Sequence, residues 1–198
     1  MWEFVDKVVY INIPSRTDRN DHMKEFTKIF GDKVTRLDGV ERTPGYLGCT
    51  QSHVRAVMLA MSHGWKNVLI LEDDAEWNQF DTNYKRLEEL ATRPYDVILL
   101  GGVCVQKDET DKVISSQTAT AYLVNGHYYP RLIENFKEGY RQLYETNNYT
   151  QFALDQHWKQ LQRVDNWYIV SNPCMVYQKP GYSNIENKHV DYRDAFQI

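Results

Sequence analysis

The segment NVLILEDD, which runs from Asn67 to Asp74, carries the clearest structural pattern in this chain. Its apolar residues 68–71 follow one another without a polar break, which is typical of a strand buried on both faces of a parallel sheet. Three carboxylates come directly after it. Because an open parallel sheet binds its ligands beyond the carboxyl ends of its strands, this acidic strand end is also the first candidate for a functional site.

Strand and helix patterns alternate on both sides of this segment. Short apolar runs predict strands at residues 7–13, 33–39 and 95–100, and helical spacing predicts helices at 15–30, 46–63 and near 87–91. Beyond residue 102 the pattern changes to antiparallel additions at 113–118 and 119–124, helices at 129–143 and 151–161, and a strand at 167–170. The sequence therefore predicts an α/β fold, with a Rossmann-like, mostly parallel sheet, helices on both faces and a small antiparallel addition. The polar, aromatic stretch 173–198 is either a frayed end or a flap over a site.

The composition favours one domain over residues 1–198 and excludes several classes of protein. With 42% hydrophobic and 13% aromatic residues, the 198-residue chain is not disordered and can bury a core of ordinary size. The formal net charge of −4 gives no general attraction for nucleic acid or an anionic membrane, so we expect no nucleic-acid partner. No apolar run approaches the roughly 18 residues that cross a bilayer, and the first seven residues lack the pattern of a signal peptide. The three cysteines are widely spaced, without a CxxC pair, which favours a reducing compartment and a cytoplasmic location.

The carboxylates at the end of the 67–72 strand have the spacing of a metal site. In an extended segment successive side chains point to opposite sides, so Glu72 and Asp74 share one side and Asp73 lies on the other. Two converging carboxylates suit Mg²⁺ or Mn²⁺, which commonly bind through one or two carboxylates and the phosphates of a substrate. The alternative is that the cluster only caps the helix after it, because carboxylates stabilise helix N-termini.

A phosphate-bearing ligand would have no glycine-rich loop to bind it. Neither GxGxxG nor GxxxxGK[ST] occurs, which disfavours a nicotinamide-dependent dehydrogenase and a P-loop enzyme. A cation on the acidic strand end would instead neutralise a diphosphate. Arg16 and Arg19 are candidates to assist it, although we expect Arg19, on a first helical turn, to be solvated more than Arg16.

Three separated segments resemble glycosyltransferase family 25 in their order and spacing. They are residues 9–19, where VYIN is followed by RTDR, residues 48–53 (GCTQSH) and residues 68–74. This family includes lipooligosaccharide galactosyltransferases and procollagen galactosyltransferases. The resemblance implies a GT-A fold and a nucleotide-sugar donor and, in the collagen-like branch, UDP-galactose, Mn²⁺ and inversion at the anomeric carbon. The acceptor would be a hydroxyl of a glycan or of collagen hydroxylysine. Residues 1–102 would form the nucleotide-sugar and metal half, and residues 103–198 the acceptor half with a C-terminal flap.

The resemblance also implies roles for individual side chains. The acidic metal motif of the family maps onto residues 72–74, which makes Glu72 and Asp74 metal ligands; His189, in the polar tail, is a candidate third ligand. Inverting transfer needs a base for the acceptor hydroxyl, and Asp155 is the candidate, unless it is only a carboxylate near a helix start. Six residues are candidate contacts to the nucleotide sugar, namely Asn12, Ile13, Arg16, Asp38, Ser52 and Asp73. His53, next to Ser52, is a further candidate.

Two other classes of function stay open on the sequence. A Mg²⁺-dependent phosphohydrolase could use a similar sheet, but the first predicted strand ends in Asn12-Ile13-Pro14 without a nucleophilic aspartate. A nucleotide-sugar or glycan-binding module without turnover would stack sugars on exposed aromatic side chains, for which the candidates are Trp77, Tyr128, Tyr129 and Trp167.

Overall fold

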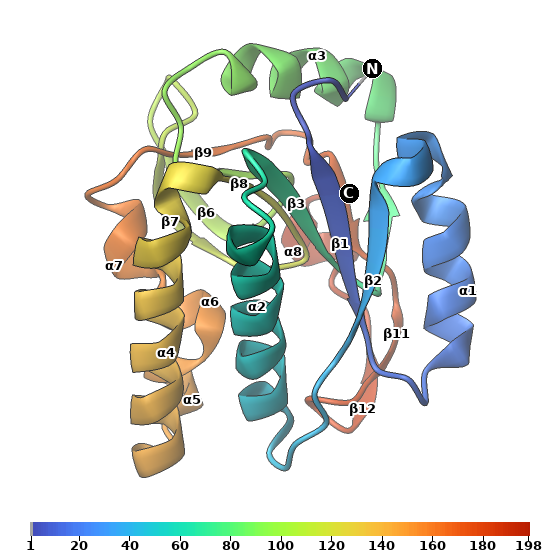
Figure 1. Cartoon of the computed structure of the whole chain (residues 1–198), viewed down its shortest axis with the longest axis vertical. Coiled ribbons are helices and arrows are strands. Elements are labelled where there is room, and N and C mark those ends of the chain that lie inside the picture. The colour runs from blue at the N-terminus through green and yellow to red at the C-terminus, as the bar shows by residue number, and fades with distance from the viewer. Residues whose placement is uncertain (1) are drawn as a thin grey trace.

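The computed structural model describes residues 2–198, and Met1 lies outside the described part. At its centre is a six-stranded sheet in the order β2-β1-β3-β8-β5-β9 (Figure 1). These strands are β1 (Lys7–Asn12), β2 (Val34–Asp38), β3 (Asn67–Glu72), β5 (Val97–Leu99), β8 (Ala121–Asn125) and β9 (Trp167–Ile169). Only β8 runs against its neighbours, since β1 pairs in parallel with β2 and β3, and β5 pairs in parallel with β9. The predicted α/β fold with a mostly parallel sheet is confirmed.

The segment predicted at 119–124 takes a different place from the expected one. It forms β8, which lies between β3 and β5 in the middle of the sheet and not at its margin. The small antiparallel addition is instead a separate hairpin of β6 (Val103–Lys107) and β7 (Val113–Gln117). A short apolar run reports that a strand is buried, but it does not report which strands lie beside it.

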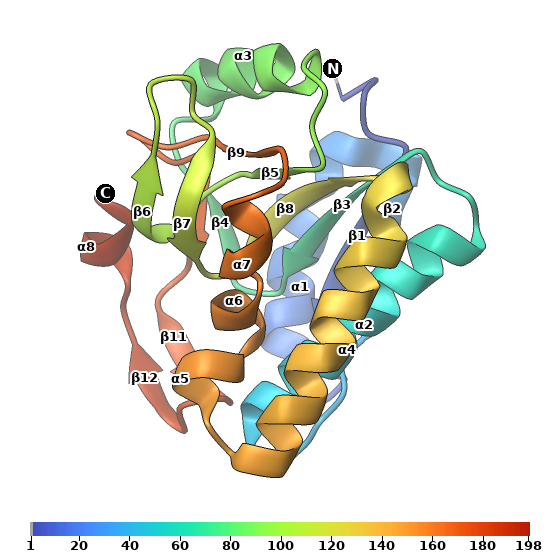
Figure 2. The same ribbon diagram turned by 90° about the vertical axis from the view of Figure 1, so that its left-hand side faces the viewer.

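Helices cover both faces of the sheet. One face packs against α2 (Gly45–Ser62) and α4 (Tyr129–Thr146), which lie side by side, and the other against α1 (Thr17–Phe26) and α3 (Phe80–Ala91) (Figures 1 and 2). Successive residues of β3 alternate between the two cores: Val68 and Ile70 face α2 and α4, whereas Leu69 and Leu71 face α1 and α3. This double burial explains the unbroken apolar run and fixes the point at which the acidic residues emerge.

The helix predicted at 151–161 is broken into three short pieces. These are α5 (Tyr149–Phe152), α6 (Leu154–His157) and α7 (Lys159–Gln162). Ala153 has extended backbone angles (φ −55°, ψ 151°) and so ends one piece and begins the next. Leu154 and Trp158 anchor the following turns in the core. The break places Asp155 in the first turn of α6.

The stretch 173–198, which we call the flap, is folded and not a frayed end. Its strand β10 (Val176–Gln178) pairs antiparallel with β4 (Ala75–Trp77), which directly follows the acidic segment. A hairpin of β11 (Gly181–Ser183) and β12 (Lys188–Val190) comes next, followed by the short helix α8 (Arg193–Phe196) (Figures 1 and 2). The pairing with β4 therefore carries residues distant in sequence to the end of β3.

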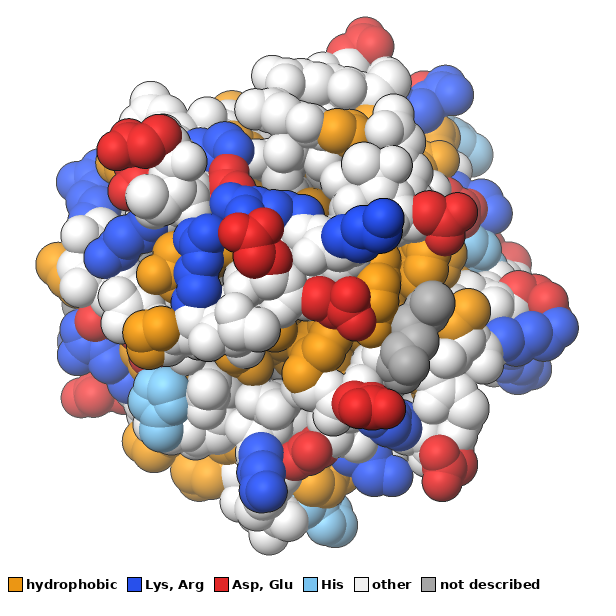
Figure 3. Space-filling model, turned by 90° about the horizontal axis from the view of Figure 1, so that it is seen from above, with side chains coloured by type: hydrophobic (Ala, Val, Ile, Leu, Met, Phe, Trp, Pro, Cys, Tyr) orange, Lys and Arg blue, Asp and Glu red, His pale blue; other side chains and the backbone are white. Residues whose placement is uncertain are grey.

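The surface agrees with the small net charge. On the end of the molecule where α3 lies, acidic and basic side chains are interspersed rather than gathered into one patch (Figure 3). Such a mixed surface gives no single-sign field to steer a polyanion. Among residues 2–198, no helix combines the length and the apolar character that crossing a bilayer requires.

Candidate active site

The carboxyl end of β3 turns sharply as soon as it leaves the sheet. Glu72 is the last residue of β3, and Asp73 and Asp74 form the turn that leads into β4. The prediction that Asp73 faces away from the other two assumed an extended chain. Because the chain turns, all three carboxylates line one cavity, whereas Glu72 and Asp74 without Asp73 line a second one, as expected for two side chains that share a side.

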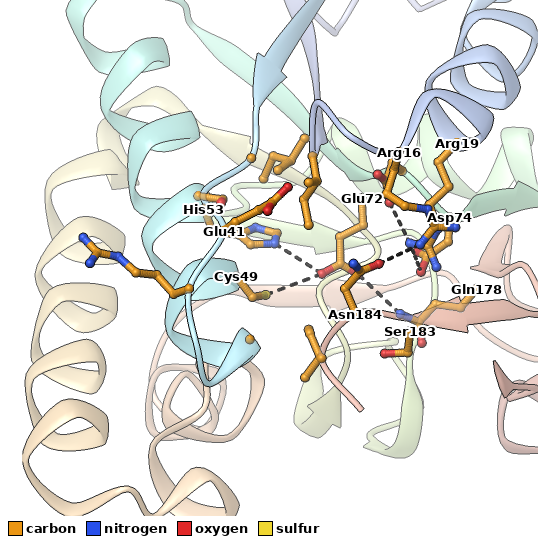
Figure 4. Close-up of a pocket in the computed structure, with 18 of the residues that line it drawn as sticks. Arg16, Arg19, Glu41, Cys49, His53, Glu72, Asp74, Gln178, Ser183 and Asn184 are labelled. Carbon is orange, nitrogen blue, oxygen red and sulfur yellow. Dashed lines mark hydrogen bonds and ion pairs between the residues drawn. The ribbon is translucent and has the colours of Figure 1, made fainter. Parts of the chain in front are cut away.

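Glu72 is held by two residues of α2 and by one residue of the flap (Figure 4). Its Oε1 lies 3.3 Å from Nε2 of His53 and accepts a hydrogen bond of 3.8 Å from Sγ of Cys49. Its Oε2 accepts from Nε2 of Gln178 at 3.4 Å. The prediction missed Gln178, since nothing in the sequence links β10 to β4.

Arg19 holds the other two carboxylates. Its Nη1 donates to Oδ1 of Asp73 at 2.7 Å and to Oδ2 of Asp74 at 3.0 Å. Nδ2 of Asn12 completes the pairing of Asp73, donating to its Oδ2 at 2.8 Å. The expectation that Arg19 is the more solvated of the two arginines is wrong, because its side chain is only 16% exposed and is pulled inward by two carboxylates.

The charges in this cluster do not balance. One guanidinium, Arg19, faces three carboxylates, and Oδ1 of Asp74 is buried with no hydrogen-bond partner in the described part of the chain. Burial and the charge of Glu72 raise the pKa of Asp74 to about 7. Burial also opposes ionisation of Glu72, but the hydrogen bond and charge of His53 and the charge of Arg19 outweigh it and lower the pKa of Glu72.

These side chains fit a divalent cation. A buried carboxylate oxygen without a partner, next to a second carboxylate in a net negative site, is the donor set that hard cations such as Mg²⁺ and Mn²⁺ take. Glu72 and Asp74 are the residues that would hold it, whereas both oxygens of Asp73 already accept hydrogen bonds.

Two chambers meet at this cluster. The first, of about 320 Å³, lies between the end of β1, the start of α2 and the flap, and the second, of about 310 Å³, lies toward β7 and α6. Their common wall consists of Cys49, Glu72, Asp74, Gln178, Ser183 and Ile185. Both volumes fall within the range of small-molecule sites, so the cleft offers two neighbouring binding places that share the acidic group.

Asp155 lines the second chamber. Its Oδ2 accepts a hydrogen bond of 3.0 Å from the backbone N–H of Thr118, and burial, with a smaller effect from the charge of Glu72, raises its pKa. Tyr46 and Tyr149 form an aromatic wall nearby, with stacked rings whose centroids are 5.5 Å apart. The second chamber thus combines one carboxylate with aromatic faces, a combination suited to a polar ligand that also has apolar surface.

The flap is tied to the first chamber by the two arginines. Nη1 of Arg16 donates to the carbonyl oxygen of Tyr182 at 3.0 Å and to Oδ1 of Asn184 at 2.7 Å. Nη2 of Arg19 donates to the same carbonyl oxygen at 2.9 Å. A single guanidinium, Arg19, therefore touches both the acidic cluster and the flap.

The other predicted contacts divide into two groups. Ile13 and Ser52 line the first chamber, although the hydroxyl of Ser52 already accepts from the backbone N–H of Val40 and donates to the carbonyl of Gly48. The remaining three predicted residues line neither chamber. Asn12 is fully buried, and Asp38 is exposed and forms an ion pair with Arg36. His189 is exposed on β12, where its ring lies edge-on to the ring of Tyr182.

Most of the aromatic side chains proposed as sugar-stacking platforms belong to the core. Tyr128, Tyr129 and Trp167 are at most 3% exposed. Trp77 is stacked on Phe26, with ring centroids 4.3 Å apart. Their faces pack against protein, so they cannot stack on a glycan, and this part of the binding-module hypothesis is wrong.

The chain matches no protein-family model and no curated protein sequence. Solved structures do match it. A glycosyltransferase involved in the glycosylation of the major capsid of PBCV-1 superposes with a TM-score of 0.57 at 11% identity, over 91% of this chain and 95% of that one. The fold is that of GT-A-like glycosyltransferases. The glycosyltransferase GlyE of Streptococcus pneumoniae TIGR4 matches with a TM-score of 0.50 at 10% identity, over 85% of this chain but only 46% of that one.

Proposed function

We propose that this protein is a metal-dependent, inverting glycosyltransferase that moves a hexose, galactose from UDP-galactose, to a hydroxyl group of a glycan or of a protein side chain such as collagen hydroxylysine. The observation that supports this most strongly is the common wall of the two chambers, because it places Glu72 and Asp74 between two adjacent binding places. Membership of glycosyltransferase family 25 is part of the proposal and rests on the three sequence motifs.

The first chamber is assigned to the nucleotide-sugar donor. Arg16 and Arg19 line it and present guanidinium groups, which bind phosphate oxygens through paired hydrogen bonds. Glu72 and Asp74 would hold the cation, which supplies charge neutralisation for the departing diphosphate. Residues 1–102 supply most of this chamber, in agreement with their assignment as the nucleotide-sugar and metal half.

The second chamber is assigned to the acceptor. Asp155 would accept the proton of the attacking hydroxyl, and the higher pKa that burial gives it makes it a better base than an exposed aspartate. Tyr46 and Tyr149 would face the rings of a glycan or the chain of an acceptor residue. Residues 103–198 contribute Asp155 and the flap to this chamber, which supports their assignment as the acceptor half.

The proposal is tested by release of UDP from UDP-galactose and other UDP-sugars, with Mn²⁺ and with chelator. Wild-type protein should release UDP only with the metal, and Asp155→Asn should lose most of the turnover while its UDP affinity stays the same. Asp21→Asn, which changes an exposed carboxylate on α1, is the matched control and should keep wild-type activity. Absence of both UDP binding and turnover would refute the assignment, and binding without turnover would identify a nucleotide-sugar-binding module.

A further inference from the structure

One turn of α2 directs two metal-ligating side chains at Glu72. Cys49 and His53 are four residues apart, and residues at this spacing lie on the same face of a helix. Both side chains point toward the same carboxylate, as the dashed lines in Figure 4 show. The sequence motif GCTQSH contains both residues, but the function proposed above uses neither of them as a ligand.

The three side chains are already close enough to share one ion. Nε2 of His53 is 3.3 Å and Sγ of Cys49 is 3.8 Å from Oε1 of Glu72, and all three ligand atoms lie within 4.8 Å of one another. Tetrahedral Zn²⁺, with bonds of about 2.0 Å to nitrogen and oxygen and about 2.3 Å to sulfur, separates its ligands by roughly 3.3–3.5 Å. Small movements of side chains would therefore complete the geometry.

The imidazole of His53 has a second hydrogen-bond partner, which fixes its orientation. Its Nδ1 lies 2.7 Å from the hydroxyl of Tyr122, and the two rings are stacked. Metal-binding histidines characteristically donate their second ring N–H to such a partner, which fixes the ring and leaves the other nitrogen free to bind. Both His53 and Tyr122 are almost fully buried, so this orientation is held by the core.

We propose that Cys49, His53 and Glu72 form a Zn²⁺ site whose fourth position opens into the first chamber. A thiolate with an imidazole favours Zn²⁺ over Mg²⁺ and Mn²⁺, which prefer oxygen ligands. All three residues line that chamber, and three protein ligands with one open position are the arrangement of a reactive rather than a purely structural zinc site. On binding, Cys49 releases its thiol proton to solvent and coordinates as the thiolate.

The surrounding charge favours a dication at this position. The Cys49 thiol lies 3.8 Å from Oε1 of Glu72 and lines the same chamber as Asp74, while Arg19 is already engaged by two of the acidic residues there. Because Glu72 belongs to both sites, Zn²⁺ would withdraw it from the hard-cation site that it forms with Asp74. If the proposed function holds, Zn²⁺ therefore inhibits the Mn²⁺-dependent transfer.

The zinc site is tested with Co²⁺, which replaces Zn²⁺ and gives a near-ultraviolet charge-transfer band when bound by a thiolate. Metal-free wild-type protein should develop this band on titration and lose it when Zn²⁺ is added. Cys49→Ser should lack the band, whereas Cys104→Ser, which removes an exposed thiol on β6, should keep it. Asp74→Asn should also keep it, since Asp74 belongs only to the hard-cation site. Circular dichroism of each variant confirms that it is folded.

A second variant tests the support of His53. Tyr122→Phe removes the hydroxyl partner of Nδ1 and should weaken Co²⁺ binding by about 10- to 100-fold without removing the band. A missing band in the wild type, a band that persists in Cys49→Ser, or a band lost in folded Asp74→Asn would each overturn the proposal. The spectra need no nucleotide sugar, so their outcome does not depend on whether the protein proves to be a glycosyltransferase.

Discussion

Replacing Asp74 by Asn is expected to stabilise the metal-free protein at pH 8 and to stabilise it much less at pH 5. Asp74 is 17% exposed, lies beside Glu72, and has one oxygen for which residues 2–198 supply no hydrogen-bond partner. Its pKa is raised to about 7 from the ordinary 3.8, so the folded protein holds the proton more tightly than the unfolded chain. Stability therefore falls as the pH rises from about 4 to about 7, and it does not change further through this group above that range.

The size of the effect follows from these two values. Compared with a neutral side chain of the same shape, Asp74 lowers the free energy of unfolding by about 4 kcal/mol at pH 8 and by about 2 kcal/mol at pH 5. Asparagine is that neutral side chain. The stability gained by Asp74→Asn should therefore grow by roughly 2–3 kcal/mol between pH 5 and pH 8.

Urea unfolding of chelator-treated protein at pH 5, 6, 7 and 8 measures this difference. The Asp38→Asn control changes an exposed carboxylate on β2 and should stay within about 0.5 kcal/mol of wild type at every pH. Adding Mn²⁺ at pH 8 should stabilise the wild type but not Asp74→Asn, because a ligand stabilises only the form that binds it. A gain for Asp74→Asn that does not vary with pH would refute the electrostatic account of the cluster.

Three further predictions concern the base, the bridging arginine and the packing of α2. In Asp155→Asn, kcat for UDP-sugar turnover should fall by about 10²- to 10⁴-fold while the Kd for UDP, measured by calorimetry, stays within about twofold of wild type; an unchanged kcat would exclude this residue as the base. Arg19→Ala removes the ion-pair partner of two carboxylates and should lower the free energy of urea unfolding by about 3 kcal/mol. It also removes a hydrogen bond to the flap, so amide hydrogen exchange of residues 181–184 should become faster. Arg141→Ala breaks an exposed ion pair and should change neither quantity. Gly48→Ala should cost about 1–3 kcal/mol, because a Cβ would overlap a backbone oxygen of the preceding loop, and Gly181→Ala, where a Cβ meets open space, is its control.

The sequence contains enough information for the sheet and for the position of its acidic edge. The run 68–71 is apolar throughout because both of its faces are buried, and that property can be read without knowing its neighbours. Helices α2 and α4 follow for a similar reason, since their apolar spacing is regular over 18 residues each. Local patterns of this kind can be recognised in the sequence because each element must have apolar residues on the face that it buries.

What the sequence does not contain is the set of long-range neighbours. Arg19 looks like an ordinary residue of a first helical turn, and only the turn at residues 73–74 brings two carboxylates to it. Asn12 has the position of a ligand-binding residue at a strand end, but its side-chain amide donates a hydrogen bond to Asp73 instead. The position of Gln178 depends on the pairing of β10 with β4, between segments about a hundred residues apart, for which no local pattern exists. The spacing of Cys49 and His53 was visible, yet their common target was not.

The pairing of β10 with β4 has a consequence for how the cleft comes into being. During synthesis, residues up to about 170 can already assemble the central sheet and both helical layers, but Gln178, Ser183 and Ile185 close the wall between the chambers only after they have emerged. Until then the acidic residues face open water on that side. The shared wall of the two chambers is therefore the last part of the cleft to be supplied by the chain, and a protein truncated in the loop after β9 would keep all six strands of the central sheet but lack that side of the cleft.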